Sequence, residues 1–268
     1  MTPLELGIVS DEVTPDFSEA VRHALGWGIR KFELRVLTSG RVPQVEEAEV
    51  AAVEEIVRAR QIQITALSPG LFKHELSKEV ELEREVRETL PATITLARRL
   101  GAPMIIIFGF HREAGESPGR YQDAVGWMRR AAAVAEAAGI RLAIENEPGF
   151  WADTGVNTRK LIRDVGSKFL GANWDPCNAF GTTERPFPEG YAAIKDVIIN
   201  VHIKDTAQGA LIKCVPVGEG VIDWKGQMAA LMRDRVVSHA TIETHCHPLV
   251  ENSRRNVETV RKYMQEPA

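Results

Sequence analysis

The sequence has few cysteines, no excess of basic residues and no long apolar run. Its three cysteines are odd in number and far apart, so neither a disulfide framework nor a paired CxxC zinc site is expected. The formal net charge of −4 gives no support for binding to nucleic acid or to an anionic membrane. No segment approaches the roughly 20 apolar residues that span a bilayer, and residues 1–13 have no basic stretch leading into an apolar run. These absences predict a cytoplasmic protein with reduced thiols.

The length of the chain favours one domain. A chain of 268 residues can bury one large core, but it would divide only awkwardly into two ordinary domains. With 44% hydrophobic and 26% charged residues, the composition is typical of a soluble globular protein. We therefore expect residues 1–268 to form a single domain.

Short β-rich runs alternate with helical stretches along the whole chain, as in successive βα units. The eight predicted strands cover residues 5–9, 30–35, 62–67, 103–108, 140–145, 169–174, 197–203 and 239–243. Eight such units in a chain of this length predict a (β/α)8 TIM barrel. An open doubly wound sheet is the alternative, but no GxGxxG follows the first run to support a dinucleotide site.

Several helix boundaries can be predicted from the residues that flank the runs. Thr14, Pro15 and Asp16 would supply an N-cap, a proline at the first helical position and an early acid for a helix that continues through residues 17–28. Further helices are expected over residues 44–61, 84–101, 120–139 and 253–265. Pro91 should kink the third of these five helices or mark its restart, and Gly101 is placed to end it.

Four polar residues stand where successive apolar runs end: Glu145, Asp175, His202 and Glu243. In a barrel, alternate side chains of a strand face the central axis or the outer helices. Counting back in twos from each of the four leaves aliphatic residues on the outward parity, including Ile144 before Glu145 and both Ile199 and Val201 before His202. Because adjacent strands lie about 4.8 Å apart, the four side chains should converge at the carboxyl end of the barrel.

Three carboxylates and one imidazole make a hard, oxygen-rich set of metal ligands. Such a set favours Mn²⁺, Mg²⁺ or Co²⁺ over the thiolate-rich sites typical of structural zinc. One divalent metal ion is therefore expected, with Zn²⁺ kept as a further alternative.

The chain resembles the xylose isomerase-like TIM barrels, also called the sugar phosphate isomerase/epimerase superfamily, over nearly its whole length. The resemblance is carried, in this order, by SDEVTPDFSEAV, FELR, AIENEPG, NWDPCNA, NVHIKD, GEGVIDW and TIETHCHP. It implies that Glu145, Asp175, His202 and Glu243 bind one divalent metal, often manganese. Many members have a second histidine three residues after the aspartate, where this chain has Asn178. Asn178 is kept as a candidate contact to substrate.

The resemblance also implies a reaction. Glu145 and Glu243 would lie on opposite sides of a sugar, sugar phosphate or related hydroxy-carbonyl compound, so that one removes a proton and the other returns one through a metal-stabilised enediolate. Delivery to the opposite face would epimerise a centre, and transfer between neighbouring carbons would isomerise it. Lys204, which shares the inward parity of His202, and the loop residues His247 and Arg112 are further candidate contacts to substrate. Barrels of this family often pair, so the resemblance leaves a homo-oligomer open as a further possibility.

Three other functions stay open at this point. An endonuclease IV-like phosphodiesterase would need more metal-binding histidines and a basic groove, and seven histidines with a net negative charge argue against it. A related lyase or dehydratase could use the same enolate chemistry. A non-catalytic binding barrel would not need all four ligands.

Some residues near the four ligands have two interpretations. Glu147 has the same parity as Glu145 and is the alternative metal ligand. We favour Glu145 as the ligand because it ends the apolar run. Asn146 would then support the loop. Lys204 is either in the site or a surface lysine that pairs with Asp205 or with a helix end.

Other motif residues have plainer structural roles as alternatives. Glu33 and Arg35 could form an internal salt bridge or contact substrate. Gly218 and Gly220 suit a tight turn better than a phosphate loop, since no GK[ST] follows them. Cys177 and Cys246 flank two of the proposed ligands, and small buried thiols explain them most simply.

Overall fold

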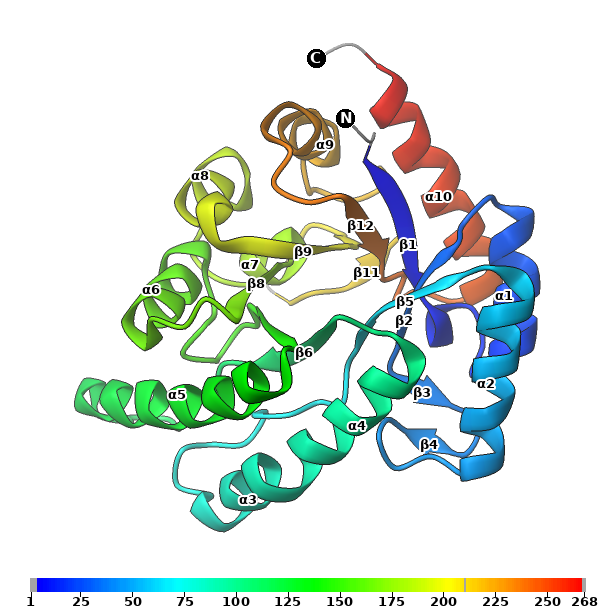
Figure 1. The fold of residues 1–268 in the computed structure, drawn as a ribbon. Helices are drawn as coiled ribbons and strands as arrows, with labels where there is room; N and C mark the ends of the chain where they lie inside the picture. Colours follow the sequence, from blue (N-terminus) through cyan, green and yellow to red (C-terminus); the bar gives the residue numbers. More distant parts are fainter. Residues whose placement is uncertain (1–3, 210, 267–268) are drawn as a thin grey trace.

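The computed structural model describes residues 4–209 and 211–266 and contains a closed barrel of eight parallel strands (Figure 1). Around the barrel the strands run in the order β1-β12-β9-β8-β7-β6-β5-β2, and β2 pairs with β1 to close it. The barrel strands are β1 (Glu5–Val9), β2 (Lys31–Leu34), β5 (Gln63–Leu67), β6 (Met104–Phe108), β7 (Arg141–Glu145), β8 (Leu170–Trp174), β9 (Ile198–Ile203) and β12 (His239–Ile242). All eight predicted strands are present, and the single-domain (β/α)8 fold is confirmed.

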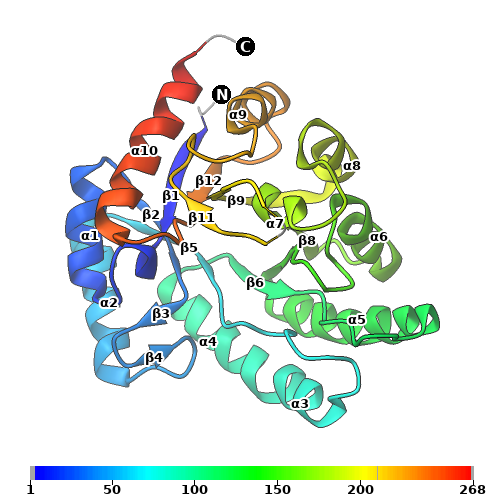
Figure 2. The ribbon, with the colours of Figure 1, turned by 180° about the vertical axis from the view of Figure 1, so that it is seen from behind.

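Helices surround the barrel on all sides (Figures 1 and 2). They are α1 (Phe17–Gly26), α2 (Glu47–Arg60), α3 (Glu79–Arg84), α4 (Leu90–Leu100), α5 (Tyr121–Ala138), α6 (Gly155–Val165), α7 (Pro176–Phe180), α8 (Tyr191–Ile194), α9 (Trp224–Asp234) and α10 (Leu249–Gln265). Short 3₁₀ helices cover Ser10–Glu12, Pro118–Arg120 and Lys195–Val197, and π-type turns cover Glu85–Thr89 and Pro186–Gly190.

Two small antiparallel ribbons, which the sequence pattern did not predict, follow barrel strands. β3 (Val36–Leu37) pairs with β4 (Gly40–Arg41) after β2, and β10 (Asp205–Thr206) pairs with β11 (Cys214–Val215) after β9. Because all barrel strands are parallel, both ribbons lie at the end of the barrel where the four polar residues were expected.

The first helix begins later than predicted. Asp16 is its N-cap, since Asp16 Oδ1 accepts a hydrogen bond from Glu19 N at 3.0 Å and the helix starts at Phe17. The prediction that Thr14 caps this helix was therefore wrong. Asp16 has an extended backbone, so Thr14 and Pro15 precede the helix.

The predicted interruption at Pro91 is confirmed. The π-type turn Glu85–Thr89 lies between α3 and α4, and Pro91 is the second residue of α4, where it has no N–H to donate to the preceding turn. Gly101 ends α4 in the left-handed conformation with φ +70°, as expected of a C′ glycine.

Strand parity divides the core into two parts. The outward aliphatic residues, such as Ile107 and Ile144, belong to the large core shared with the helices. The inward residues Met104, Ile106 and Ala143 form, with Ala66, a small separate core inside the barrel. The interior thus has an apolar floor, and the polar residues lie above it toward the carboxyl ends of the strands.

Ile199 is an exception to the predicted parity. It was expected to face outward, but it packs against the small inner core. The register between β8 and β9 shifts by one residue after Ala172, which turns the start of β9. Gly171 makes room for Ile199, because a Cβ at Gly171 would lie 2.7 Å from Ile199 Cγ2.

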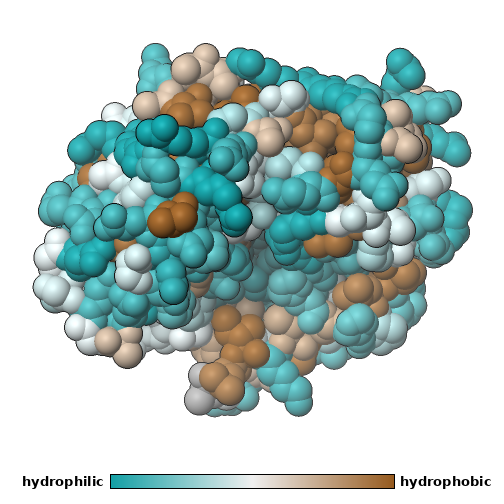
Figure 3. All heavy atoms as spheres, turned by 90° about the horizontal axis from the view of Figure 1, so that it is seen from below, coloured by the Kyte–Doolittle hydropathy of each residue, from teal (hydrophilic) through white to brown (hydrophobic). Residues whose placement is uncertain are grey.

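The face of the molecule shown in Figure 3 is mainly polar. Hydrophilic residues predominate on it, and apolar residues form separate patches (Figure 3). No helix within residues 4–209 and 211–266 combines the length and hydropathy needed to cross a membrane.

Candidate active site

All four residues predicted as metal ligands meet at one end of the barrel. Each offers an oxygen or nitrogen atom that lies within 4.8 Å of those of the others. None is more than 5% exposed. β7 ends in Glu145, β9 carries His202, and Asp175 and Glu243 directly follow β8 and β12. We refer to Glu145, Asp175, His202 and Glu243 as the carboxylate cluster.

Asparagines hold two members of the carboxylate cluster in place. Glu145 accepts hydrogen bonds from Asn178 Nδ2 at 3.1 Å and from Asn173 Nδ2 at 3.2 Å. Asn146 exchanges two hydrogen bonds of 2.8 Å with the backbone of Asp175, as its predicted supporting role requires. Asp175 also caps α7 by accepting from Asn178 N at 3.0 Å.

His202 is oriented by a carboxylate on the floor of the site. Its Nε2 lies 2.7 Å from Glu33 Oε2, whereas its Nδ1 lies 3.5 Å from both Glu145 Oε2 and Glu243 Oε2. Asn200 in turn donates to Glu33 at 2.8 Å. The structure therefore places Glu33 in an internal ion pair, which leaves Nδ1 of His202 facing the carboxylates.

Lys204 lies within the carboxylate cluster. Its Nζ is 2.8 Å from Asp175 Oδ2, 2.9 Å from Glu243 Oε2 and 4.0 Å from Glu145 Oε1. The structure shows the predicted inward orientation of Lys204. Among the ion pairs of the described residues there is none between Lys204 and Asp205.

Asp205, in β10, instead organises the glycine-containing loop that follows β11. Its carboxylate accepts backbone N–H bonds from Gly218 at 2.9 Å, Gly220 at 3.3 Å and Ile222 at 3.1 Å. A Cβ at Gly220 would lie 2.1 Å from Asp205 Oδ1. These N–H groups are thus occupied by a protein carboxylate, in agreement with a turn and not with a phosphate loop.

Charges within the carboxylate cluster compensate one another. Burial opposes ionisation of Glu243, yet Lys204, His202 and His245 hold the pKa of its carboxyl well below the ordinary value. Burial likewise opposes a charge on Lys204, but Asp175, Glu243 and Glu145 raise the pKa of its ammonium. For Asp175, burial prevails and raises the pKa of the carboxyl. The carboxylates of the carboxylate cluster therefore stabilise a cation that lies between them.

The carboxylate cluster fits a divalent metal ion. It provides three carboxylates and one imidazole nitrogen, and its oxygens already converge on the ammonium of Lys204. Glu145, Asp175, His202 and Glu243 are the residues that would hold the ion.

A second group of charged residues adjoins Glu243. Arg35 Nη1 donates to Glu243 Oε1 at 2.9 Å, and the same guanidinium contacts Asp11 at 2.9 Å and Glu12 at 2.5 Å. Arg35 thus takes part in internal ion pairs. His245 Nδ1 contacts Glu12, and its Nε2 lies 3.5 Å from Glu243 Oε1.

Sequence reasoning did not select Glu12 or His245. His245 stands two residues beyond Glu243, so the same parity that selected Lys204 after His202 would have found it. Its φ of +51° is unusual for a residue other than glycine and is held by the hydrogen bond from its backbone N to Glu12 at 2.6 Å. Glu12 lies in a 3₁₀ turn, where strand parity no longer applies.

A cavity of about 420 Å³ opens beside the carboxylate cluster. Glu145 and Glu243 line it, together with Lys204, Asn178 and His245. Asp175 and His202 are not among the lining residues and lie behind this wall. The cavity therefore gives a ligand access to two carboxylates of the cluster.

The remaining predicted site residues lie outside this wall or have other partners. His247 is exposed and does not line the cavity. Arg112 pairs with Asp153 at 2.5 Å and also lies outside the lining. Glu147 lines the cavity, but it pairs with Lys73 at 2.9 Å and is not part of the carboxylate cluster.

The cysteines are free thiols. Cys177 and Cys246 are buried, as expected, and Cys214 lines the cavity.

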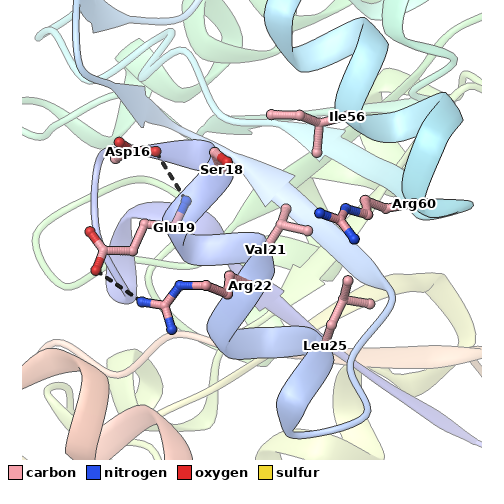
Figure 4. A pocket seen from close by; sticks show the side chains of 8 residues that line it. All are labelled: Asp16, Ser18, Glu19, Val21, Arg22, Leu25, Ile56 and Arg60. Carbon is pink, nitrogen blue, oxygen red and sulfur yellow. Dashed lines mark hydrogen bonds and ion pairs between the residues drawn. The ribbon is translucent and has the colours of Figure 1, made fainter.

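A hollow of about 500 Å³ between α1 and α2 lacks the features of an active site (Figure 4). Its polar contacts are the cap of α1 by Asp16 and the ion pair of Glu19 with Arg22 at 3.2 Å, both within one helix. The convergence of buried charges is found at the barrel end instead.

Comparison with known structures agrees with this fold. The D-allulose 3-epimerase of Methylomonas sp., solved in complex with D-allulose, is 17% identical with a TM-score of 0.79, and 98% of each chain is covered. The probable 3-DHS dehydratase AsbF of Bacillus anthracis is 16% identical with a TM-score of 0.79, covering 96% of this chain and 99% of that one. IOLI protein with a bound zinc atom is 15% identical with a TM-score of 0.79, covering 97% and 96%.

Comparison with curated protein sequences gives no match. The profile of the family described as "Xylose isomerase-like TIM barrel" matches residues 21–266, which is nearly the whole chain. The resemblance noted from the sequence motifs is thereby confirmed. The chain belongs to the xylose isomerase-like TIM barrel family.

Proposed function

We propose that this protein is a divalent-metal-dependent isomerase or epimerase of a sugar, sugar phosphate or related hydroxy-carbonyl compound. The observation that carries the proposal is the unequal access to the carboxylate cluster. Glu145 and Glu243 reach the cavity wall, whereas Asp175 and His202 lie behind it. This division suits two residues that only hold an ion and two that can also exchange protons with a substrate.

A divalent ion held by the carboxylate cluster would polarise a substrate carbonyl and so acidify the adjacent C–H. Burial works against ionisation of Glu145, but His202 and Lys204 hold the pKa of its carboxyl below the ordinary value, so it can accept a proton. Glu243 is ionised for similar reasons. One of the two carboxylates would remove the proton, and the other would return it.

The surrounding residues prepare these two carboxylates for their roles. Asn173 and Asn178 fix both oxygens of Glu145, and Arg35 fixes Oε1 of Glu243. Lys204 lies within the carboxylate cluster and also lines the cavity, so its ammonium would stabilise negative charge on a substrate oxygen. Delivery of the proton to the opposite face would give epimerisation, and delivery to the neighbouring carbon would give isomerisation.

Manganese remains the proposed ion, with magnesium, cobalt and zinc as alternatives. Cytoplasmic location and pairing of barrels into a homo-oligomer also remain proposals. A phosphodiesterase is disfavoured, because each of the two candidate metal-binding groups among the described residues contains only one histidine.

Solvent deuterium exchange tests the proposal. Purified protein is analysed for bound metal and then incubated in D₂O with ketoses, aldoses and hydroxy-keto acids. We expect incorporation of deuterium next to the carbonyl, and loss of at least a hundredfold of this exchange in Glu145→Gln and Glu243→Gln.

Glu147→Gln is the matched control, because Glu147 lines the same cavity but lies outside the carboxylate cluster. If both cluster variants kept full metal content and full exchange, the assigned site would be wrong. Loss of water from the substrate during exchange would identify a lyase instead of an isomerase.

A further inference from the structure

We propose that Arg41 binds an anionic group of the substrate, so that the protein acts on a carboxylated or phosphorylated hydroxy-carbonyl compound in preference to a neutral sugar. The inference rests on the proposed function for the part of the substrate that meets the carboxylate cluster. The inference adds the chemical class of the rest of the substrate, which would carry an anionic group.

Arg41 is a cavity-lining cation with spare hydrogen-bond donors. Its Nη1 donates to the backbone oxygen of Ser68 at 3.1 Å, and this is its one hydrogen bond among the described residues. A guanidinium has five N–H donors in a planar fork, so most of them remain available. Arg41 is exposed, which leaves it accessible to a ligand that enters the cavity.

The other cations of the cavity are already paired with carboxylates. Arg35 contacts Asp11, Glu12 and Glu243, as described above. Lys73 pairs with Glu147 and lies 3.8 Å from the ring centroid of Phe108. Lys204 lies among Asp175 and Glu243.

Arg41 makes no ion pair with any residue in the described part of the chain. Burial, followed by the neighbouring charge of Arg35, lowers the pKa of its guanidinium, and the carboxylate of Asp11, which is paired with Arg35, offsets this only in part. An anionic ligand would use the donors of Arg41 that no described residue occupies.

The backbone fixes the position of Arg41 before any ligand arrives. Arg41 belongs to the β3–β4 ribbon, where it is paired with Val36, and Val42 N donates to Arg35 O at 3.1 Å. Gly70, with φ +82°, passes beside the guanidinium, and a Cβ there would come within 3.4 Å of Arg41 Nη1. The ribbon thus ties Arg41 to the end of β2, next to the arginine that binds Glu243.

Carboxylates and phosphates both match the fork of a guanidinium with two parallel hydrogen bonds. The geometry therefore specifies an oxyanion, and experiment distinguishes its source. Matched pairs of ligands serve as probes: D-ribulose with D-ribulose 5-phosphate, and D-fructose with D-fructuronate.

The test measures dissociation constants of the four probes by calorimetry on the metal-loaded full chain and on three variants. The native chain should bind at least one anionic probe tenfold or more tightly than its neutral partner. Arg41→Gln should abolish this preference and leave the affinity for the neutral sugars within about twofold. Arg41→Lys, which keeps the charge but not the fork, should retain part of it.

Arg60→Gln is the control for loss of one positive charge, since Arg60 lies in the hollow between α1 and α2, away from the cavity. Preference for the phosphate only or for the carboxylate only would support the proposal and name the source. Equal affinity for charged and neutral probes, no binding of either anion, or a preference that survives in Arg41→Gln would overturn it. Failure of the proposed reaction would appear separately, as absence of C–H exchange with charge discrimination intact.

Discussion

At the scale of single residues, the buried carboxyl of Glu85 contrasts with those of the carboxylate cluster. Glu145 and Glu243 lie beside cations that keep them ionised. The neighbours of Glu85 compensate less: burial raises its pKa to about 7, and the hydrogen bond from Phe72 N and the charge of Arg84 offset this only in part, while His74 Nε2 lies 3.7 Å from Glu85 Oε1. A proton on Glu85 is therefore bound more tightly in the folded chain than in the unfolded one.

The raised pKa of Glu85 predicts a pH-dependent loss of stability. The folded pKa of about 7 exceeds the unfolded value of 4.5, so this contribution is complete below pH 4.5 and is lost as the pH rises through 7. Glu85→Gln keeps an oxygen for the N–H of Phe72 and cannot ionise. The free energy of unfolding of the variant should equal that of the native chain at pH 4.5 and exceed it by about 1 to 3 kcal/mol at pH 8.

Urea denaturation at several pH values between 4.5 and 8 measures this difference. Glu88→Gln is a matched control from the same turn, where Glu88 is exposed. Parallel stability curves for the native chain and Glu85→Gln would contradict the prediction.

At the scale of secondary-structure elements, the contact between β8 and β9 shows how a register shift creates a requirement for glycine. The shift turns Ile199 into the barrel, where its side chain occupies the space a Cβ on Gly171 would need. The same shift lets Asn200 and His202 keep their inward orientation further along β9. The floor of the barrel and the carboxylate cluster therefore depend on one strand pair.

Substitution at this contact should show strong coupling. Gly171→Ala would place a Cβ within 2.7 to 2.9 Å of three Ile199 carbons and should destabilise the fold by about 1 to 3 kcal/mol. Ile199→Ala removes those carbons. The double variant should thus be more stable than the sum of the two single changes predicts, as a double-mutant cycle in urea would measure. Strictly additive effects would show that Ile199 and Gly171 do not compete for this space.

At the scale of the whole molecule, the carboxylate cluster joins four strands that are adjacent in the barrel, β7, β8, β9 and β12, and Glu33 on β2 contacts His202. The four members of the cluster lie between residues 145 and 243, and Glu33 connects them to the N-terminal part of the chain, so an ion bound by the cluster acts on most of the barrel. Ion binding and global stability should therefore be linked.

A divalent ion should raise the unfolding temperature of the intact chain. At a free-ion concentration about 100 times the dissociation constant, the gain is about 2.7 kcal/mol, which corresponds to several degrees. Differential scanning calorimetry after chelation and after addition of Mn²⁺, Mg²⁺, Co²⁺ or Zn²⁺ would measure it. Asp175→Asn should lose most of this shift and Glu147→Gln should keep it. Equal shifts in the two variants would locate the ion elsewhere.

The sequence by itself determined the eight strands, their order in the chain and the parity of Glu145, Asp175, His202 and Glu243. These features depend on local periodicity: side chains alternate with a period of two, and apolar runs end where a strand meets solvent. The same local information placed Lys204 among the inward residues.

Only the tertiary structure decided which side chains meet across the barrel. The pairing of Glu33 with His202 joins residues 169 positions apart, and the contact of Glu12 with His245 closes the barrel from its first strand to its last. The register shift that turns Ile199 inward and the ribbon that presents Arg41 arise from pairing between strands. Such contacts depend on barrel closure and register, which a periodicity of two residues along one strand does not encode.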